Sequence, residues 1–246
     1  MSMFSLSGRR ALVTGANTGI GQAIAVGLAE AGAEVICAGR RSCDETVEAI
    51  TQAGGSASSV LVDFADPMAG QGLFGDAPID ILVNNAGIIR RADALEFSEA
   101  DWDAVMDVNL KALFFTTQAF AKAVMAREGT GAVVNIASLL SFQGGIRVPS
   151  YTASKHGVAG LTKLLANEWA AKGINVNAVA PGYIETNNTE ALRNDPERNQ
   201  AILDRIPAGR WGQAEDIAGA AVYLSSPAAK YVHGAVLNVD GGWLAR

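Results

Sequence analysis

The sequence predicts an α/β fold, a single domain built on a doubly wound parallel sheet of about seven strands with helices on both faces. Two observations support this prediction. Short runs rich in Ala, Val, Ile and Leu alternate about six times with longer amphipathic segments, and the links between them are short and contain Gly or Pro. Strands buried on both faces have such apolar sequences, and regular alternation of strand and helix is typical of a parallel sheet covered by helices.

The apolar runs are expected as strands and the amphipathic segments as helices. The expected strands are Ala11–Thr14, Glu34–Ala38, Ser59–Asp63, Ile79–Val83, Ala132–Ala137, Asn175–Ala180 and Val236–Val239. The expected helices are Gly21–Ala31, Glu45–Ala53, Glu99–Arg127, Tyr151–Lys172 and Glu215–Ser225. Residues 64–78 contain an Asp-Pro pair and three glycines, so any helix there is expected to be short.

Residues 185–210 are expected to be irregular or loosely helical, because Pro196 and Pro207 interrupt them. The segment follows the carboxyl end of a strand, where α/β sheets bind ligands. A flexible substrate lid and an ordinary surface excursion are both compatible with this pattern. No linker, internal repeat or charge run divides the chain, so residues 1–246 are expected to form one domain.

The composition argues against several classes of protein. Apolar residues make up 49% and charged residues 18% of the chain, which is typical of a folded domain. The net charge is −6 without a basic block, which argues against nucleic acid as a partner. No apolar run is long enough to span a membrane and the first residues lack a signal pattern, so a cytoplasmic protein is expected. Cys37 and Cys43 have no disulfide or metal-site spacing, and no metal is expected.

A glycine-rich turn follows the first expected strand and opens a helix. Its sequence is Thr14-Gly15-Ala16-Asn17-Thr18-Gly19-Ile20-Gly21, with the spacing G-x3-G-x-G. A helix N-terminus presents unpaired N–H groups and a positive dipole end to an anion, and glycines let the backbone approach a pyrophosphate. The context therefore indicates a Rossmann-type dinucleotide site at Gly15, Asn17, Thr18, Gly19, Ile20 and Gly21, with a βα turn that binds no ligand as the alternative.

The end of the second expected strand bears on the choice of dinucleotide. An acidic residue there would bind the ribose diol of NAD, but the sequence is Ala38-Gly39-Arg40-Arg41. Arg40 or Arg41 can pair with the 2′-phosphate of NADP through forked hydrogen bonds, and Arg40 is taken as the expected contact. NADP is therefore favoured and NAD remains the alternative, as does an arginine that only stacks on the adenine.

Tyr151 and Lys155 lie four residues apart near the start of an expected helix, on one face of it. A neighbouring ammonium favours phenolate, so the pKa of Tyr151 is expected to be lowered toward the range of a general acid/base. A lone pair of this kind is usually a surface pair. Here Ser138 stands thirteen residues upstream after an apolar strand, and Asn84-Asn85-Ala86-Gly87 ends another, which favours catalysis.

With these segments the chain resembles a short-chain dehydrogenase/reductase over essentially its whole length. The segments that carry the resemblance are TGANTGIG (14–21), NNAG (84–87), Asn109, Ser138, YTASK (151–155) and PGYIET (181–186). The resemblance implies that Tyr151 is the acid/base, that Lys155 lowers its pKa and binds the nicotinamide ribose, that Ser138 polarises the substrate oxygen, and that Asn109 holds a water in a proton relay. It also implies dinucleotide contacts at Asp63, Phe64, Asn85, Ala86, Gly87, Tyr151, Lys155, Pro181, Gly182, Ile184 and Thr186.

Polar residues near the expected active site indicate the substrate class. The candidates are Arg90 and Arg91, Gln143 and Arg147, Asn187-Asn188-Thr189, and Arg210-Trp211. Of these, Arg90, Gln143, Arg147 and Asn188 are selected as the expected substrate residues. An arginine suits the carboxylate of a sugar acid and the amides suit its hydroxyls, and Arg147 is favoured because its loop returns it beside Ser138 and Tyr151. Segments such as NNAGIIRR, YIETNNT and DGGWLAR also resemble the 2-deoxy-D-gluconate 3-dehydrogenase group, also described as 2-dehydro-3-deoxy-D-gluconate 5-dehydrogenases, which implies reversible oxidation of a secondary hydroxyl on a deoxy sugar acid.

Two other functions remain open. A 3-oxoacyl-carrier-protein reductase would share every core motif, although residues 141–150 are polar for an acyl substrate. A non-catalytic dinucleotide-binding protein would need neither Tyr151 nor Lys155. The family resemblance further implies a homotetramer, in which Trp243 could close a neighbouring subunit's pocket or pad an interface.

Overall fold

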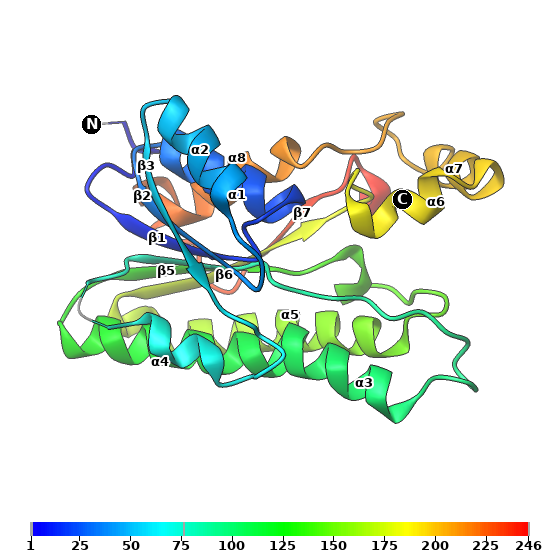
Figure 1. The fold of residues 1–246 in the computed structure, drawn as a ribbon, viewed down its shortest axis with the longest axis horizontal. Helices are drawn as coiled ribbons and strands as arrows, with labels where there is room; N and C mark the ends of the chain where they lie inside the picture. The colour runs from blue at the N-terminus through cyan, green and yellow to red at the C-terminus, as the bar shows by residue number, and fades with distance from the viewer. Residues whose placement is uncertain (1, 76, 246) are drawn as a thin grey trace.

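The computed structural model describes residues 2–75 and 77–245 and contains one sheet of seven parallel strands (Figure 1). The strand order is β3-β2-β1-β4-β5-β6-β7, so the order reverses between β1 and β4. Ligands of α/β proteins bind at such a reversal, beyond the carboxyl ends of the strands. The strands are β1 (Arg10–Thr14), β2 (Glu34–Gly39), β3 (Ser56–Leu61), β4 (Ile81–Asn84), β5 (Gly131–Ile136), β6 (Ile174–Pro181) and β7 (Val236–Val239).

Helices cover both faces of the sheet, which confirms the predicted doubly wound fold. On one face lie α1 (Gly19–Glu30), α2 (Asp44–Gln52) and α8 (Glu215–Ser225); on the other lie α3 (Glu99–Met106), α4 (Leu113–Ala126) and α5 (Pro149–Trp169) (Figure 1). Each face has its own apolar core. Ile24, Leu28 and Ile217 belong to the first, whereas Phe120 and Leu165 belong to the second.

Two strands, β3 and β4, begin more than one residue away from the predicted position. β3 begins at Ser56 and ends at Leu61, where Ser59–Asp63 was expected. This strand is an edge strand with a mostly exposed, serine-rich sequence, so it has no apolar run to mark its start. β4 begins at Ile81, two residues after the expected Ile79, although Ile79 is itself buried.

The long helix expected over Glu99–Arg127 is continuous as far as Ala126, but its middle is π-helical. α3 leads into a π-helical segment, Asp107–Ala112, and α4 follows it without a break. π-helical turns are often found at functional sites, and this one contains Asn109. The following helix begins at Pro149, so Tyr151 lies in its first turn.

The two segments with weak patterns form short helices. Among residues 64–75, 77 and 78, which the structure describes, the helical segment is the short 3-10 helix Ala69–Leu73. In residues 185–210 a 3-10 turn, Asn187–Thr189, precedes α6 (Glu190–Arg193) and α7 (Pro196–Leu203), which project beyond the carboxyl ends of the strands (Figure 1). Within the described part of the chain, no helix combines the length and apolarity that crossing a membrane requires.

Candidate active site

The glycine turn after β1 is built for close backbone packing. Gly15 and Gly19 have φ values of +65° and +58°, in the left-handed region that favours glycine. A Cβ at Gly21 would collide with the carbonyl oxygen of Gly15, so the first turn of α1 can sit on the end of β1 only with glycine there. The turn therefore brings the start of α1 directly over the strand end.

The loops after β1 and β4 are fastened to each other at the reversal of strand order. The hydroxyl oxygen of Thr14 accepts hydrogen bonds from the N–H groups of Asn85 and Ala86, at 3.0 Å each. The amide of Asn85 donates in return to the carbonyl oxygens of Thr14 (3.0 Å) and Gly15 (3.1 Å). These contacts fix the glycine turn against the NNAG segment.

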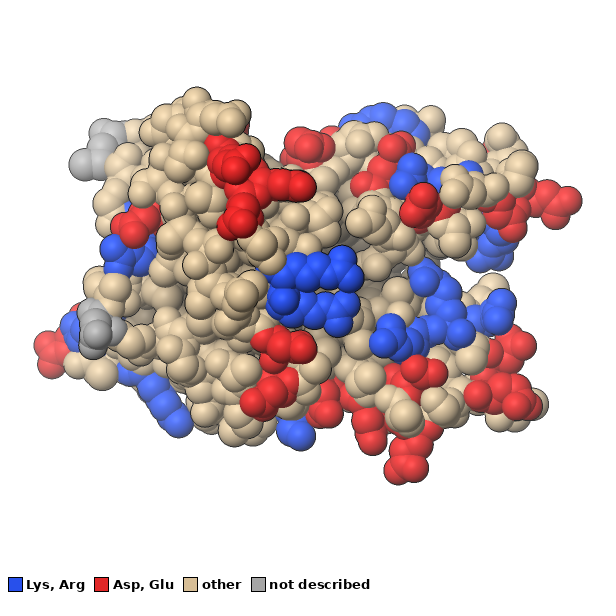
Figure 2. Space-filling model, viewed as in Figure 1, with Lys and Arg blue, Asp and Glu red and all other residues tan. Residues whose placement is uncertain are grey.

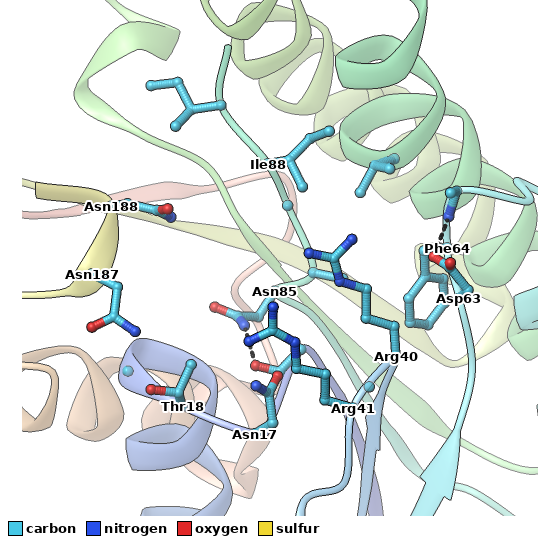
Figure 3. Close-up of a pocket in the computed structure, with 18 of the residues that line it drawn as sticks. Asn17, Thr18, Arg40, Arg41, Asp63, Phe64, Asn85, Ile88, Asn187 and Asn188 are labelled. Atoms are coloured by element: carbon cyan, nitrogen blue, oxygen red, sulfur yellow. Dashed lines mark hydrogen bonds between the residues drawn. The ribbon is translucent and has the colours of Figure 1, made fainter. Parts of the chain in front are cut away.

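A cleft of about 680 Å³ opens between the loops after β1, β2, β3 and β4 and the segment that follows β6 (Figure 3). Much of the predicted dinucleotide site lines it: Gly15, Asn17, Thr18, Gly19, Ile20, Arg40, Asp63, Phe64, Asn85, Ala86, Gly87 and Thr186. Arg90 and Asn188, two of the predicted substrate residues, line it as well. Residues from five loops thus meet at one edge of the sheet.

Six residues of the predicted dinucleotide set are not part of this lining. Gly21 is packed inside the glycine turn. Pro181 is the last residue of β6, and Gly182 follows it. Ile184 is 4% exposed and packs in the core. The remaining two, Tyr151 and Lys155, belong to α5 and are described below.

Three observations indicate that the cleft can hold the phosphates of a dinucleotide. Thr18, the N-cap of α1, makes no side-chain capping hydrogen bond, and the first turn of α1 has no acidic residue, so its N–H groups are open to an anion. A Cβ on Gly39 would lie 3.2 Å from the carbonyl oxygen of Arg41, so this loop is also tight. Arg40 and Arg41 extend from the end of β2 over the cleft, and neither forms an ion pair with any residue in the described ranges (Figure 3).

The charge distribution on this face agrees with an anionic ligand. Figure 2 shows Lys and Arg side chains gathered beside the hollow between the two halves of the molecule, with Asp and Glu side chains above and below them. No acidic side chain occurs among residues 38–41 at the end of β2. The site therefore offers unpaired positive charge where NAD-binding proteins carry a carboxylate.

Lys155 is buried and held close to Tyr151. Its Nζ lies 5.5 Å from the centre of the Tyr151 ring and donates a 2.6 Å hydrogen bond to the carbonyl oxygen of Ile136. Only 5% of Lys155 is exposed, and burial lowers its pKa from 10.5 to about 8. The side chain is therefore still mostly an ammonium at pH 7.

The predicted lowering of the Tyr151 pKa is wrong for the chain by itself. Burial raises the pKa of Tyr151 above 10, because the phenolate loses its hydration. A hydrogen bond with the Ser138 side chain and the positive charge of Arg91 act in the opposite direction but do not outweigh burial. Tyr151 therefore holds its proton at neutral pH, in the state of a general acid.

Asn109 joins the π-helical segment to the loop after β4. Its Oδ1 accepts from the N–H of Ile88 at 2.8 Å, and its Nδ2 donates to the carbonyl oxygen of the same residue at 2.9 Å. A longer contact of 3.4 Å links Nδ2 to the hydroxyl of Ser154 on α5. The side chain thus connects the cleft wall, through Ile88, to the helix that carries Tyr151 and Lys155.

The four predicted substrate residues have different surroundings. The Nε atoms of Arg90 and Arg147 lie 3.2 Å and 3.1 Å from the carboxylates of Asp101 and Asp93, respectively. Arg147 is exposed and is not part of the cleft lining, so the structure does not place it with the other candidates. Asn188 lines the cleft, and Gln143 accepts a 3.3 Å hydrogen bond from the indole of Trp243.

Sequence reasoning gave little weight to Arg91. Its charge reaches Tyr151, and its guanidinium donates a 3.0 Å hydrogen bond to the carbonyl oxygen of Asn188. Arg91 has no ion-pair partner among residues 2–75 and 77–245. The sequence places it beside Arg90 without showing which of the two is neutralised by a carboxylate.

Comparison with known proteins gives consistent results. A family model described as Enoyl-(Acyl carrier protein) reductase matches residues 15–244. The 2-dehydro-3-deoxy-D-gluconate 5-dehydrogenase of Bacillus subtilis (strain 168) is 57% identical over 99% of this chain and 97% of that protein. The protein of the same name from Dickeya dadantii (strain 3937) is 53% identical over 100% and 99%. A solved structure from Agrobacterium tumefaciens with bound NADP is 78% identical, covers 100% of both chains and has a TM-score of 0.99.

Proposed function

Since the chain belongs to the short-chain dehydrogenase/reductase family, we propose that it reversibly oxidises a secondary hydroxyl of a deoxy sugar acid of the 2-dehydro-3-deoxy-D-gluconate type. It is an NAD(P)-dependent oxidoreductase, and NADP is its dinucleotide. The observation that carries this proposal is full-length identity of more than 50% to enzymes of that name. The contacts of Tyr151 with Ser138 and Lys155 support it. The alternative of a non-catalytic dinucleotide-binding protein is therefore set aside.

The dinucleotide half of the site follows from the cleft. The open N–H groups at the start of α1 bind the pyrophosphate, and Arg40 and Arg41 bind the 2′-phosphate through charge-assisted hydrogen bonds. In this proposal Asp63, which lines the cleft, is the residue on the adenine side. When bound, NADP supplies the site that accepts or returns a hydride.

The proton is handled by the chain's own side chains. The Ser138 hydroxyl, which shares a hydrogen bond with Tyr151 in the chain without ligand, turns its single O–H to the substrate oxygen, and Oη of Tyr151 gives or takes the proton of the substrate hydroxyl. The Lys155 ammonium, held by the Ile136 carbonyl, lies near enough to the ring to stabilise the phenolate when it forms. Asn109 fixes Ile88 and α5 relative to each other and, in this proposal, its segment holds the water of a proton relay to Lys155.

Arg91 is the best candidate to bind the substrate carboxylate. Its charge acts to lower the pKa of Tyr151 and has no carboxylate partner in the described ranges, whereas Arg90 and Arg147 are paired with Asp101 and Asp93. A guanidinium binds a carboxylate with two parallel hydrogen bonds. Its bond to Asn188 also links the substrate carboxylate to the proposed lid, residues 185–210.

Initial rates separate this function from its alternative. We expect oxidation of 2-dehydro-3-deoxy-D-gluconate with NADP⁺ and far slower reduction of a 3-oxoacyl thioester with NADPH. The family model's description names an acyl-carrier-protein reductase, which makes the thioester the right comparison. A higher kcat/KM with the thioester than with the sugar acid would overturn the proposed substrate class.

We extend the proposal to the oligomeric state and the cellular location of the enzyme. The enzyme is a cytoplasmic homotetramer, in which outward apolar residues of the helical layer such as Trp102 and Leu164, 40% and 47% exposed, are covered by a second copy. Light scattering that gave the mass of one 25.5 kDa chain would contradict the tetramer.

A further inference from the structure

The C-terminal residues pack tightly against the segment that follows α7. The Asp240 carboxylate accepts a 2.9 Å hydrogen bond from the N–H of Gly242 and shapes the 3-10 turn Trp243–Ala245. Gly241 has a φ of +63°, and a Cβ there would come within 2.9 Å of Cγ2 of Ile206. The terminal turn therefore has a fixed place beside the proposed lid.

Trp243 connects three segments that surround the substrate side of the active site. Its side chain is 4% exposed, and its ring centre lies 4.7 Å from that of Tyr183, which follows β6. The guanidinium of Arg205, just after α7, stacks 4.0 Å from the ring. Its indole N–H donates at 3.3 Å to Oε1 of Gln143, in the loop between Ser138 and Tyr151. These contacts lie within one chain, so the ring does not need a neighbouring subunit to be buried.

The indole N–H determines how the Gln143 amide is turned. An indole nitrogen donates and cannot accept, so only the oxygen of the amide can face it. The amino group of Gln143 then points away from Trp243 with two N–H donors, and it has no acceptor among the residues that the structure describes. The hydroxyl and carboxylate oxygens of a sugar acid are suitable acceptors.

We propose that Trp243 is a positioning residue for substrate recognition: its indole N–H fixes the Gln143 amide so that the amino group donates to an oxygen of the sugar acid. This inference rests on the proposed function. Trp243 contributes to substrate binding and not to dinucleotide binding, because neither Trp243 nor Gln143 lines the dinucleotide cleft.

The test is Trp243→Phe, which keeps a ring for Tyr183 and Arg205 but removes the donor. We expect the KM for 2-dehydro-3-deoxy-D-gluconate to rise about 3- to 10-fold, as for loss of one hydrogen bond, with kcat and the Kd of NADPH within twofold of the unaltered chain. Trp211→Phe is the matched control. It also removes a buried indole donor, which reaches Asn199 at 2.7 Å, but leaves Gln143 untouched, so its KM is expected to stay unchanged.

Gln143→Ala and the double variant complete the cycle. If Trp243 acts through Gln143, the double variant has the KM of Gln143→Ala alone. KM increases that multiply in the double variant, or a KM for Trp243→Phe no higher than for Trp211→Phe, would overturn the inference while leaving the proposed function intact. An unaltered chain that turns over no deoxy sugar acid would overturn both.

Discussion

Replacing Arg91 by Gln tests which arginine binds the substrate carboxylate. The variant keeps a polar amide but removes the guanidinium, which donates to the Asn188 carbonyl at 3.0 Å and whose charge acts on Tyr151. A hydrogen bond to a charged group contributes about 1.5–3 kcal/mol. Because each 1.36 kcal/mol is tenfold, kcat/KM should fall about 10- to 150-fold.

The assay compares 2-dehydro-3-deoxy-D-gluconate with its methyl ester, which has the same hydroxyls and no charge. Arg91→Gln should reduce kcat/KM for the acid and leave the ester within about threefold, since only the acid loses a charged partner. Arg147→Gln is the control, because Arg147 is exposed and paired with Asp93, and its kcat/KM should change less than twofold. Equal losses on acid and ester, or a larger acid-specific loss for Arg147→Gln, would refute the assignment.

Three further predictions address the proton and the dinucleotide. Tyr151→Phe should lower kcat about 10²- to 10⁴-fold, because the proton-transfer group is gone, while fluorescence titration should give an unchanged Kd for NADPH. Burial lowers the pKa of Lys155 from 10.5 to about 8, so between these pH values the unfolded chain binds more protons than the folded chain. The free energy of unfolding should therefore rise with pH in this window, by about 3 kcal/mol from this group. Denaturant titrations of Lys155→Met at pH 8 and 10.5 should lack that rise. Arg40→Ser with Arg41→Ser should raise the KM for NADP⁺ at least about tenfold and change that for NAD⁺ far less, and a parallel change in both would contradict binding of the 2′-phosphate.

Local patterns explain why the fold and the dinucleotide half could be predicted from the sequence. Buried parallel strands such as β5 and β6 have continuous apolar sequences. The glycine turn is defined by residues within one eight-residue stretch, and the sign of charge after β2 is visible in Arg40 and Arg41. β3 could not be placed correctly because its pairing with β2 does not depend on burial.

The substrate half depends on contacts between residues far apart in the chain. Arg147 pairs with Asp93 across 54 positions, and Gln143 meets Trp243 across 100. Neither contact has a local pattern, so the sequence could identify the candidates but not which of them are already paired. The Tyr151 pKa has the same limitation, because its sign depends on burial by surrounding elements and not on the nearby ammonium alone.

The dinucleotide cleft and the substrate side of the active site are held by different kinds of contact. The dinucleotide cleft is held by backbone groups and by Thr14 and Asn85, so changes in residues 185–210 or at the C-terminus leave its hydrogen bonds in place. The substrate side is held by Arg91 on Asn188 and by Trp243 on Gln143, both of which depend on where the proposed lid and the terminal turn pack. Substitutions at Arg91, Gln143 and Trp243, which do not line the dinucleotide cleft, should therefore change the KM for the sugar acid without changing the affinity for NADPH, whereas substitutions in the glycine turn should do the reverse.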